Sequence, residues 1–131
     1  MVQSPEEALR VLNDQSLEAS QREAAIHYLR EQPSAANAEQ LVAVLEDDAP
    51  GVRWAAAMAL GHYGQMAFTP LLRALVQPTI NARLREGAHR VLSHTTAPEA
   101  LPHLKEFLQA LQGLGADDAT MDVAIKILRG E

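Results

Sequence analysis

Residues 41–61 read LVAVLEDDAPGVRWAAAMALG, and this stretch decides the fold. It contains an apolar segment, a short Asp-Asp-Ala-Pro turn at 47–50 and a second apolar segment. In both segments apolar residues recur every three or four positions, which is the spacing of one face of an α-helix. The stretch therefore predicts a hairpin of two α-helices.

A pattern taken from this stretch recurs along the whole chain: Arg, Ala three residues later and Leu seven residues later. Its copies are Arg22/Ala25/Leu29, Arg53/Ala56/Leu60, Arg85/Ala88/Leu92 and, with Met in place of Arg, Met121/Ala124/Leu128. A period of just over 30 residues is typical of stacked helical repeats. We therefore expect an all-α fold, a short α-solenoid of about four helical hairpins in one domain over residues 1–131.

Capping and helix-breaking residues place the repeats at about 4–32, 36–65, 67–95 and 97–131. The expected helices cover about 5–13, 17–31, 37–46, 50–63, 69–77, 81–93, 97–111 and 118–128. Their starts are read from Ser4-Pro5-Glu6-Glu7, from Asn37 with Gln40, from Thr69-Pro70 and from Thr96 with Glu99. Gly64 is expected to end the fourth helix with a positive φ.

Composition limits the classes of function. The chain has no cysteine, which excludes disulfides, a thiol nucleophile and thiolate metal ligands. It has no apolar run near the ~20 residues that a membrane span requires. We therefore expect a cytoplasmic protein without a membrane span.

The net charge of −6 is unevenly distributed along the chain. Residues 1–50 carry three basic and ten acidic side chains, residues 51–95 five and one, and residues 96–131 three and six. The resulting charges are −7, +4 and −3, so the middle of the chain is basic. These charges either only solvate outer faces or favour an acidic or mixed-charge partner.

No catalytic or metal-binding motif stands out in the sequence. The acidic pairs Asp47-Asp48 and Asp117-Asp118 fall in expected turns, where Asp serves as a helix cap. No two of the five histidines have the i, i+4 spacing of a ligand pair on one helix face. We therefore expect no catalytic residues, no bound metal and no cofactor.

The segments 41–48 and 52–61 resemble HEAT repeats, specifically the HEAT-like repeats named after phycobilisome lyases. The resemblance implies a right-handed solenoid and a ladder between repeats, formed by a turn Asp and an Arg of the second helix. Asp47 and Arg53 match this pattern, Asp14 with Arg22 matches it loosely, and the third and fourth repeats lack the Asp. Arg22, Arg53 and Arg85 are accordingly expected to bind turn carbonyls or carboxylates inside the stack rather than phosphate.

In stacked hairpins of this kind the second helices line the concave side. Residues one, five and nine positions after the repeating Arg lie off the core face. They are Glu23/His27/Glu31, Trp54/Met58/His62, Glu86/Arg90/His94 and Asp122/Lys126/Gly130. We predict a partner-binding groove formed by Trp54, Met58, His62, His27, Arg30, Glu86 and Arg90. In the alternative interpretation, Trp54 and Met58 pack between repeats as ordinary core.

The leading hypothesis for function is a non-catalytic protein–protein interaction or scaffold module that binds a partner protein in this groove. The resemblance implies an alternative, a bilin lyase-like protein or a pigment–protein assembly or turnover factor that binds a tetrapyrrole or a phycobiliprotein. The net charge disfavours nucleic acid as a partner. A homodimer is a further alternative, formed through apolar residues of the last repeat at Leu111, Leu114 and Ile127.

Overall fold

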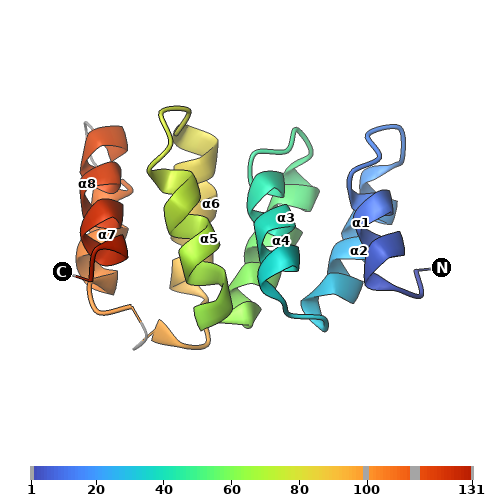
Figure 1. Cartoon of the computed structure of the whole chain (residues 1–131). Coiled ribbons are helices and arrows are strands. Elements are labelled where there is room, and N and C mark those ends of the chain that lie inside the picture. The colour runs from blue at the N-terminus through green and yellow to red at the C-terminus, as the bar shows by residue number, and fades with distance from the viewer. Residues whose placement is uncertain (1, 99–100, 113–115, 131) are drawn as a thin grey trace.

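The computed structural model describes residues 2–98, 101–112 and 116–130, and these residues form eight α-helices and no β-strand. The fold is the expected all-α solenoid of helical hairpins (Figure 1). The helices are α1 (Pro5–Leu12), α2 (Ala19–Arg30), α3 (Ala35–Val44), α4 (Pro50–Tyr63), α5 (Gln65–Leu75), α6 (Ala82–Ser93), α7 (Leu104–Ala110) and α8 (Ala116–Leu128).

Side-chain caps fix the start of three helices. The side-chain oxygens of Ser4, Ser34 and Asn81 accept hydrogen bonds from the backbone N–H three residues further on, at 3.2, 3.0 and 3.0 Å. The expected start of α3 at Asn37 was wrong, because Ser34 is the cap. Asn37 is instead buried in the first turn of α3, where its side-chain nitrogen donates to the carbonyl oxygen of Gln32 at 2.7 Å.

Helix α5 begins at Gln65, not at the expected Thr69-Pro70, and Pro70 lies inside it. Gly64 has φ 62° and ψ −130°, a conformation open to glycine alone, so the chain turns directly from α4 into α5. The early turn buries Ala67 and Phe68. Burial of these side chains outweighs the preference of proline for the first helical turn.

The expected long helix over 97–111 was also wrong, because α7 covers only Leu104–Ala110. Pro102 has no N–H to donate to the carbonyl of Pro98, and its ring would collide with that carbonyl in a helix. Residues 101–103 form a bend and a turn instead, and the Leu101 N–H donates to the carbonyl of Pro98 at 3.2 Å. Glu99, the second residue of the expected capping box, lies outside the described residues.

The helices form two rows. Helices α2, α4 and α6 pack side by side in one row, and α3 and α5 pack in the other, which also contains α1 (Figure 1). The last hairpin reverses this order: α8 packs against α5, and α7 packs against α6. The second helix of the fourth hairpin therefore does not continue the row of α2, α4 and α6.

The space between the rows is filled mainly by Leu, Ala, Val and Ile side chains, in a chain with only five aromatic residues. Helix α4 is central to the packing, because it contacts α2, α3 and α6. Within the described ranges, every helix is too short or too polar to cross a lipid bilayer.

Candidate functional site

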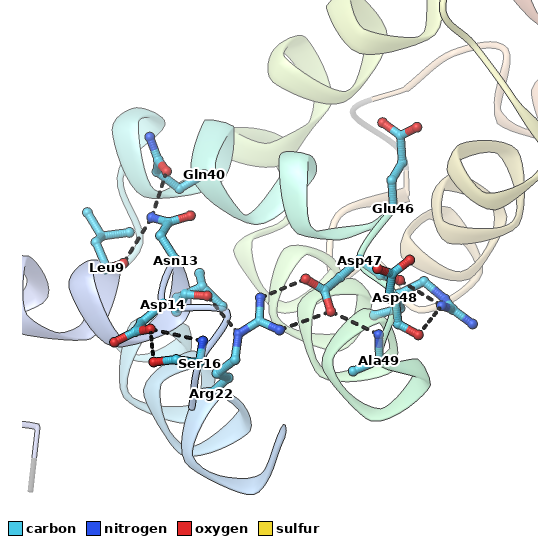
Figure 2. A network of polar contacts seen from close by, with 12 residues as sticks. Leu9, Asn13, Asp14, Ser16, Arg22, Gln40, Glu46, Asp47, Asp48 and Ala49 are labelled. Carbon is cyan, nitrogen blue, oxygen red and sulfur yellow. Dashed lines mark hydrogen bonds and ion pairs between the residues drawn. The ribbon is translucent and has the colours of Figure 1, made fainter. Parts of the chain in front are cut away.

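The first junction between hairpins contains a buried ion pair, Arg22 with Asp47 (Figure 2). The two terminal nitrogens of Arg22 donate to Oδ2 and Oδ1 of Asp47 at 3.1 and 2.6 Å, and Nε donates to the carbonyl of Leu12 at 2.9 Å. The side chains are only 5% and 7% exposed. Arg22 thereby joins the first hairpin to the turn of the second.

Asp47 stays ionised in this position. Burial by itself raises the pKa of a carboxyl group, but the hydrogen bonds from Arg22 and from the backbone N–H of Ala49, with the Arg22 charge, outweigh it. The pKa of Asp47 is therefore below its usual value of 3.8.

The other two repeating arginines also have partners within the chain. Arg53 donates to the carbonyls of Asp47 and Asp48 at 2.7 and 3.3 Å, so it binds the turn of its own hairpin. Arg85 donates from Nε to Oδ1 of Asp117 at 2.7 Å and from Nη1 to the carbonyl of Leu111 at 3.1 Å. The fourth repeat thus supplies an Asp for this contact after all, but from the first turn of α8 and not from the expected interhelical turn.

A groove of about 300 Å³ lies between α2 and α4. Its lining comes from four residues of each helix: Glu23, Ile26, His27 and Arg30 from α2, and Trp54, Ala55, Met58 and Ala59 from α4. We refer to these eight residues as the α2–α4 groove. The alternative that Trp54 is ordinary core is wrong, because 46% of its surface is exposed, while Met58 is partly buried.

Trp54 is held in place from the side of α6. The guanidinium carbon of Arg90 lies 4.7 Å from the centroid of the indole ring, a cation–π contact, and the ring of His94 meets the indole edge-on at 6.3 Å. Glu86 in turn binds Arg90 at 3.2 Å. Contacts within the chain therefore set the orientation of Trp54.

The structure brings together most of the predicted groove residues. The residues that line the groove are His27, Arg30, Trp54 and Met58. Arg90 contacts the indole ring of Trp54, and Glu86 pairs with Arg90. His62 is exposed near the end of α4 and is not among the lining residues.

The fourth expected line of groove residues, Asp122, Lys126 and Gly130, was wrong because α8 belongs to the other row. Sequence reasoning also missed the apolar floor of the groove at Ile26, Ala55 and Ala59, because helical spacing assigned these residues to the core. Only the way in which α2 and α4 pack leaves a hollow above them.

Among the described residues, no three His, Asp or Glu side chains lie close enough together to hold a metal ion. The titratable side chains that line the groove are one carboxylate, one imidazole and one guanidinium, and they lie beside an apolar floor and the indole of Trp54. Such a surface suits non-covalent binding of a group with apolar and charged parts.

Comparison with known families gives two overlapping matches to the model of HEAT repeats, over residues 6–79 and 38–114. The two matches together cover most of the chain. No curated protein and no solved structure matches the chain significantly.

Proposed function

Because the chain belongs to the HEAT-repeat family, we propose that it is a non-catalytic interaction module whose partner protein binds in the α2–α4 groove. The observation that carries the proposal is the exposed indole of Trp54 at the wall of a groove with an apolar floor. Tryptophan is enriched among the few desolvated residues that contribute most of the binding energy at protein interfaces.

Two further features support this function. Arg90 and His94 hold the indole, so less side-chain entropy is lost on binding. The charge of +4 over residues 51–95 favours an acidic or mixed-charge partner, and affinity for it should decrease with salt, since exposed charges are screened within ~8 Å at physiological ionic strength.

The experiment compares affinity capture from a native extract of the source organism with the wild-type chain and two variants. Trp54→Ala removes the wall of the groove. Met66→Ala is the matched control, because Met66 is 45% exposed, almost as much as Trp54, but lies on α5 in the other row. A protein retained by the wild type and the control but lost with Trp54→Ala, all three being folded by circular dichroism, supports the proposal.

Equal capture by all three proteins would place the binding site elsewhere. The competing functions have their own readouts in the same preparation. Absorbance of a co-purified or added open-chain tetrapyrrole would point to the pigment-related function, and light scattering would detect a homodimer.

A further inference from the structure

The six arginines of α2, α4 and α6 differ in whether their side chains have a partner within the chain. Five of the six have a partner within the chain: Arg22 with Asp47, Arg53 with turn carbonyls, Arg83 with Asp48, Arg85 with Asp117, and Arg90 with Glu86 and Trp54. The side chain of Arg30 has no hydrogen-bond or ion-pair partner among the described residues. Arg30 is also the arginine that lines the α2–α4 groove.

The acidic side chain of the groove, Glu23, does not neutralise Arg30. Its carboxylate lies against the N-terminus of α4, where a Cβ built on Gly51 would be only 2.8 Å from Oε2. The N-cap residue Ala49 makes no side-chain cap hydrogen bond, and the partial positive charge of this helix terminus attracts a carboxylate. Among the described contacts, Glu23 therefore lies against the first turn of α4 and forms no ion pair with Arg30.

The groove beside Arg30 accepts an apolar group. Ile26, Ala55 and Ala59 form its floor, with Met58 as an adaptable wall. A volume of about 300 Å³ is at the lower end of the range for ligand sites, ~300–1,000 Å³. This size suits one large side chain rather than an extended molecule.

From these observations, and resting on the function proposed above, we infer the chemistry of the occupant. It is an internal acidic segment of a partner protein that inserts one large aliphatic or aromatic side chain between α2 and α4. A neighbouring Asp or Glu of that segment pairs with Arg30, and its backbone packs on Trp54. A guanidinium binds a carboxylate through two parallel hydrogen bonds, which also fixes the register of the segment.

The test uses a set of nonapeptides that are acetylated and amidated at their ends, so that no terminal carboxylate contributes. Each has a central Leu or Phe flanked by Asp and Glu, by Ser and Gly, or by Lys and Arg. None contains Trp, so the fluorescence of Trp54, the single tryptophan of the chain, reports binding at the groove. Peptides are titrated against the full chain at low and physiological salt.

We expect the acidic peptides to bind about tenfold more tightly than the neutral ones, and the basic peptides to bind most weakly. Arg30→Gln should lower the affinity of the acidic set to that of the neutral set while leaving the neutral set unchanged. Arg73→Gln is the matched control, because Arg73 is exposed on α5 in the other row and should change neither affinity.

Three results would overturn the inference: no preference for acidic over neutral peptides, a preference that survives Arg30→Gln, or no binding by any peptide. The proposed function is judged separately. A partner protein whose capture depends on Trp54 would leave that function standing after any of these three results, whereas equal capture by the variants would remove it even if the peptides bound.

Discussion

The Arg22–Asp47 pair shows how single side chains connect the hairpins. Removing two charges from water is costly, and the cost is recovered only if both groups find good partners. Asp47 accepts from Arg22 twice and from the N–H of Ala49, and Nε of Arg22 is taken by the carbonyl of Leu12. Either side chain without the other would be a buried and uncompensated charge.

We expect Asp47→Asn to lower the free energy of unfolding by about 3–5 kcal/mol, because it leaves Arg22 buried without its counter-ion. The adjacent residue provides the control. The side chain of Asp48 is 98% exposed and its partner Arg83 is half exposed, so Asp48→Asn should change stability by less than about 1 kcal/mol. Urea unfolding followed by circular dichroism measures both, and equal effects would contradict the structural role of the buried pair.

The lowered pKa of Asp47 predicts how stability depends on acid. A carboxyl group whose pKa is lower in the folded state contributes stability above its unfolded pKa of ~3.9, and this contribution is lost as the pH falls through the folded pKa. Unfolding curves from pH 7 down to about pH 2 should therefore show a decrease in wild-type stability below about pH 4 that is smaller in Asp47→Asn. Parallel pH profiles for the wild type and Asp47→Asn would show that the loss of stability in acid does not come from Asp47.

Tyr63 gives the corresponding prediction at alkaline pH. Its hydroxyl donates to the carbonyls of Leu29 and Gln32 at 2.6 and 3.2 Å, and burial raises its pKa to about 12 although a hydrogen bond with Asn37 opposes the shift. Because the pKa of Tyr63 is raised in the folded state, its contribution to the free energy of unfolding is complete below the unfolded pKa of ~10. This contribution is lost as the pH rises toward 12. In the Tyr28→Phe variant Tyr63 is the remaining tyrosine, so the phenolate absorbance reports Tyr63 alone. This absorbance should rise near pH 12, and a rise near pH 10 while the protein is folded would contradict the prediction.

At the scale of helices, their ends depend on a few residues with local roles. Ser4, Ser34 and Asn81 start helices through their side chains, and Gly64 separates α4 from α5 by itself. Gly61 allows a close approach: a Cβ at this position would lie 3.0 Å from the carbonyl oxygen of His94. The same approach brings the imidazole of His94 to the edge of Trp54, so a glycine on α4 helps to form the site.

We expect Gly64→Ala to destabilise the protein by about 1–3 kcal/mol, because its φ and ψ are unfavourable for any residue with a Cβ. The added carbon would also lie 3.0 Å from Oγ1 of Thr96. Gly130 is the control, since it too has a positive φ, 76°, but a Cβ there meets nothing within 4 Å and the residue follows the last helix. Thermal unfolding should show a lower midpoint for Gly64→Ala and little change for Gly130→Ala.

The sequence predicted the helices best where capping residues and apolar spacing agree, as in α4, whose bounds at Pro50 and Tyr63 were predicted correctly. The prediction of helix bounds failed where tertiary packing or an internal proline determined where a helix begins. The packing of Phe68 draws Pro70 into the interior of α5, and Pro102 shortens α7.

The candidate site, like the helices, was predicted only in part from the sequence. Spacing identified Trp54 and Met58, but the groove floor at Ile26 has the same spacing as core residues and becomes visible only when two helices are packed. The reversed row order of α7 and α8 has no local signal in the sequence, so it could not be predicted.

At the scale of the whole molecule, the contacts of each helix determine how easily it opens. Helix α4 packs against helices on several sides, whereas α8 is at the end of the solenoid and packs mainly against α5 and α7. In stacked repeats, stability is a sum of the repeats and their interfaces, so an end helix with fewer neighbours opens at lower free energy.

We therefore expect the backbone amides of α8 to exchange with solvent through openings of lower free energy than those of α4. Hydrogen exchange followed by NMR measures both sets in one sample. Equal protection of α4 and α8 would mean that the solenoid opens as a single cooperative unit, contrary to the expectation from its contacts.

The polar connections between hairpins also differ in strength along the solenoid. The first junction has the buried Arg22–Asp47 pair, whereas the second relies on exposed contacts such as Arg83 with Asp48 and the amide of Asn81 with Glu46. The second junction should therefore bend more easily than the first. Trp54 and Arg90 lie on opposite sides of the second junction, so a partner that immobilises the indole would stiffen this junction and fix the local curvature of the solenoid.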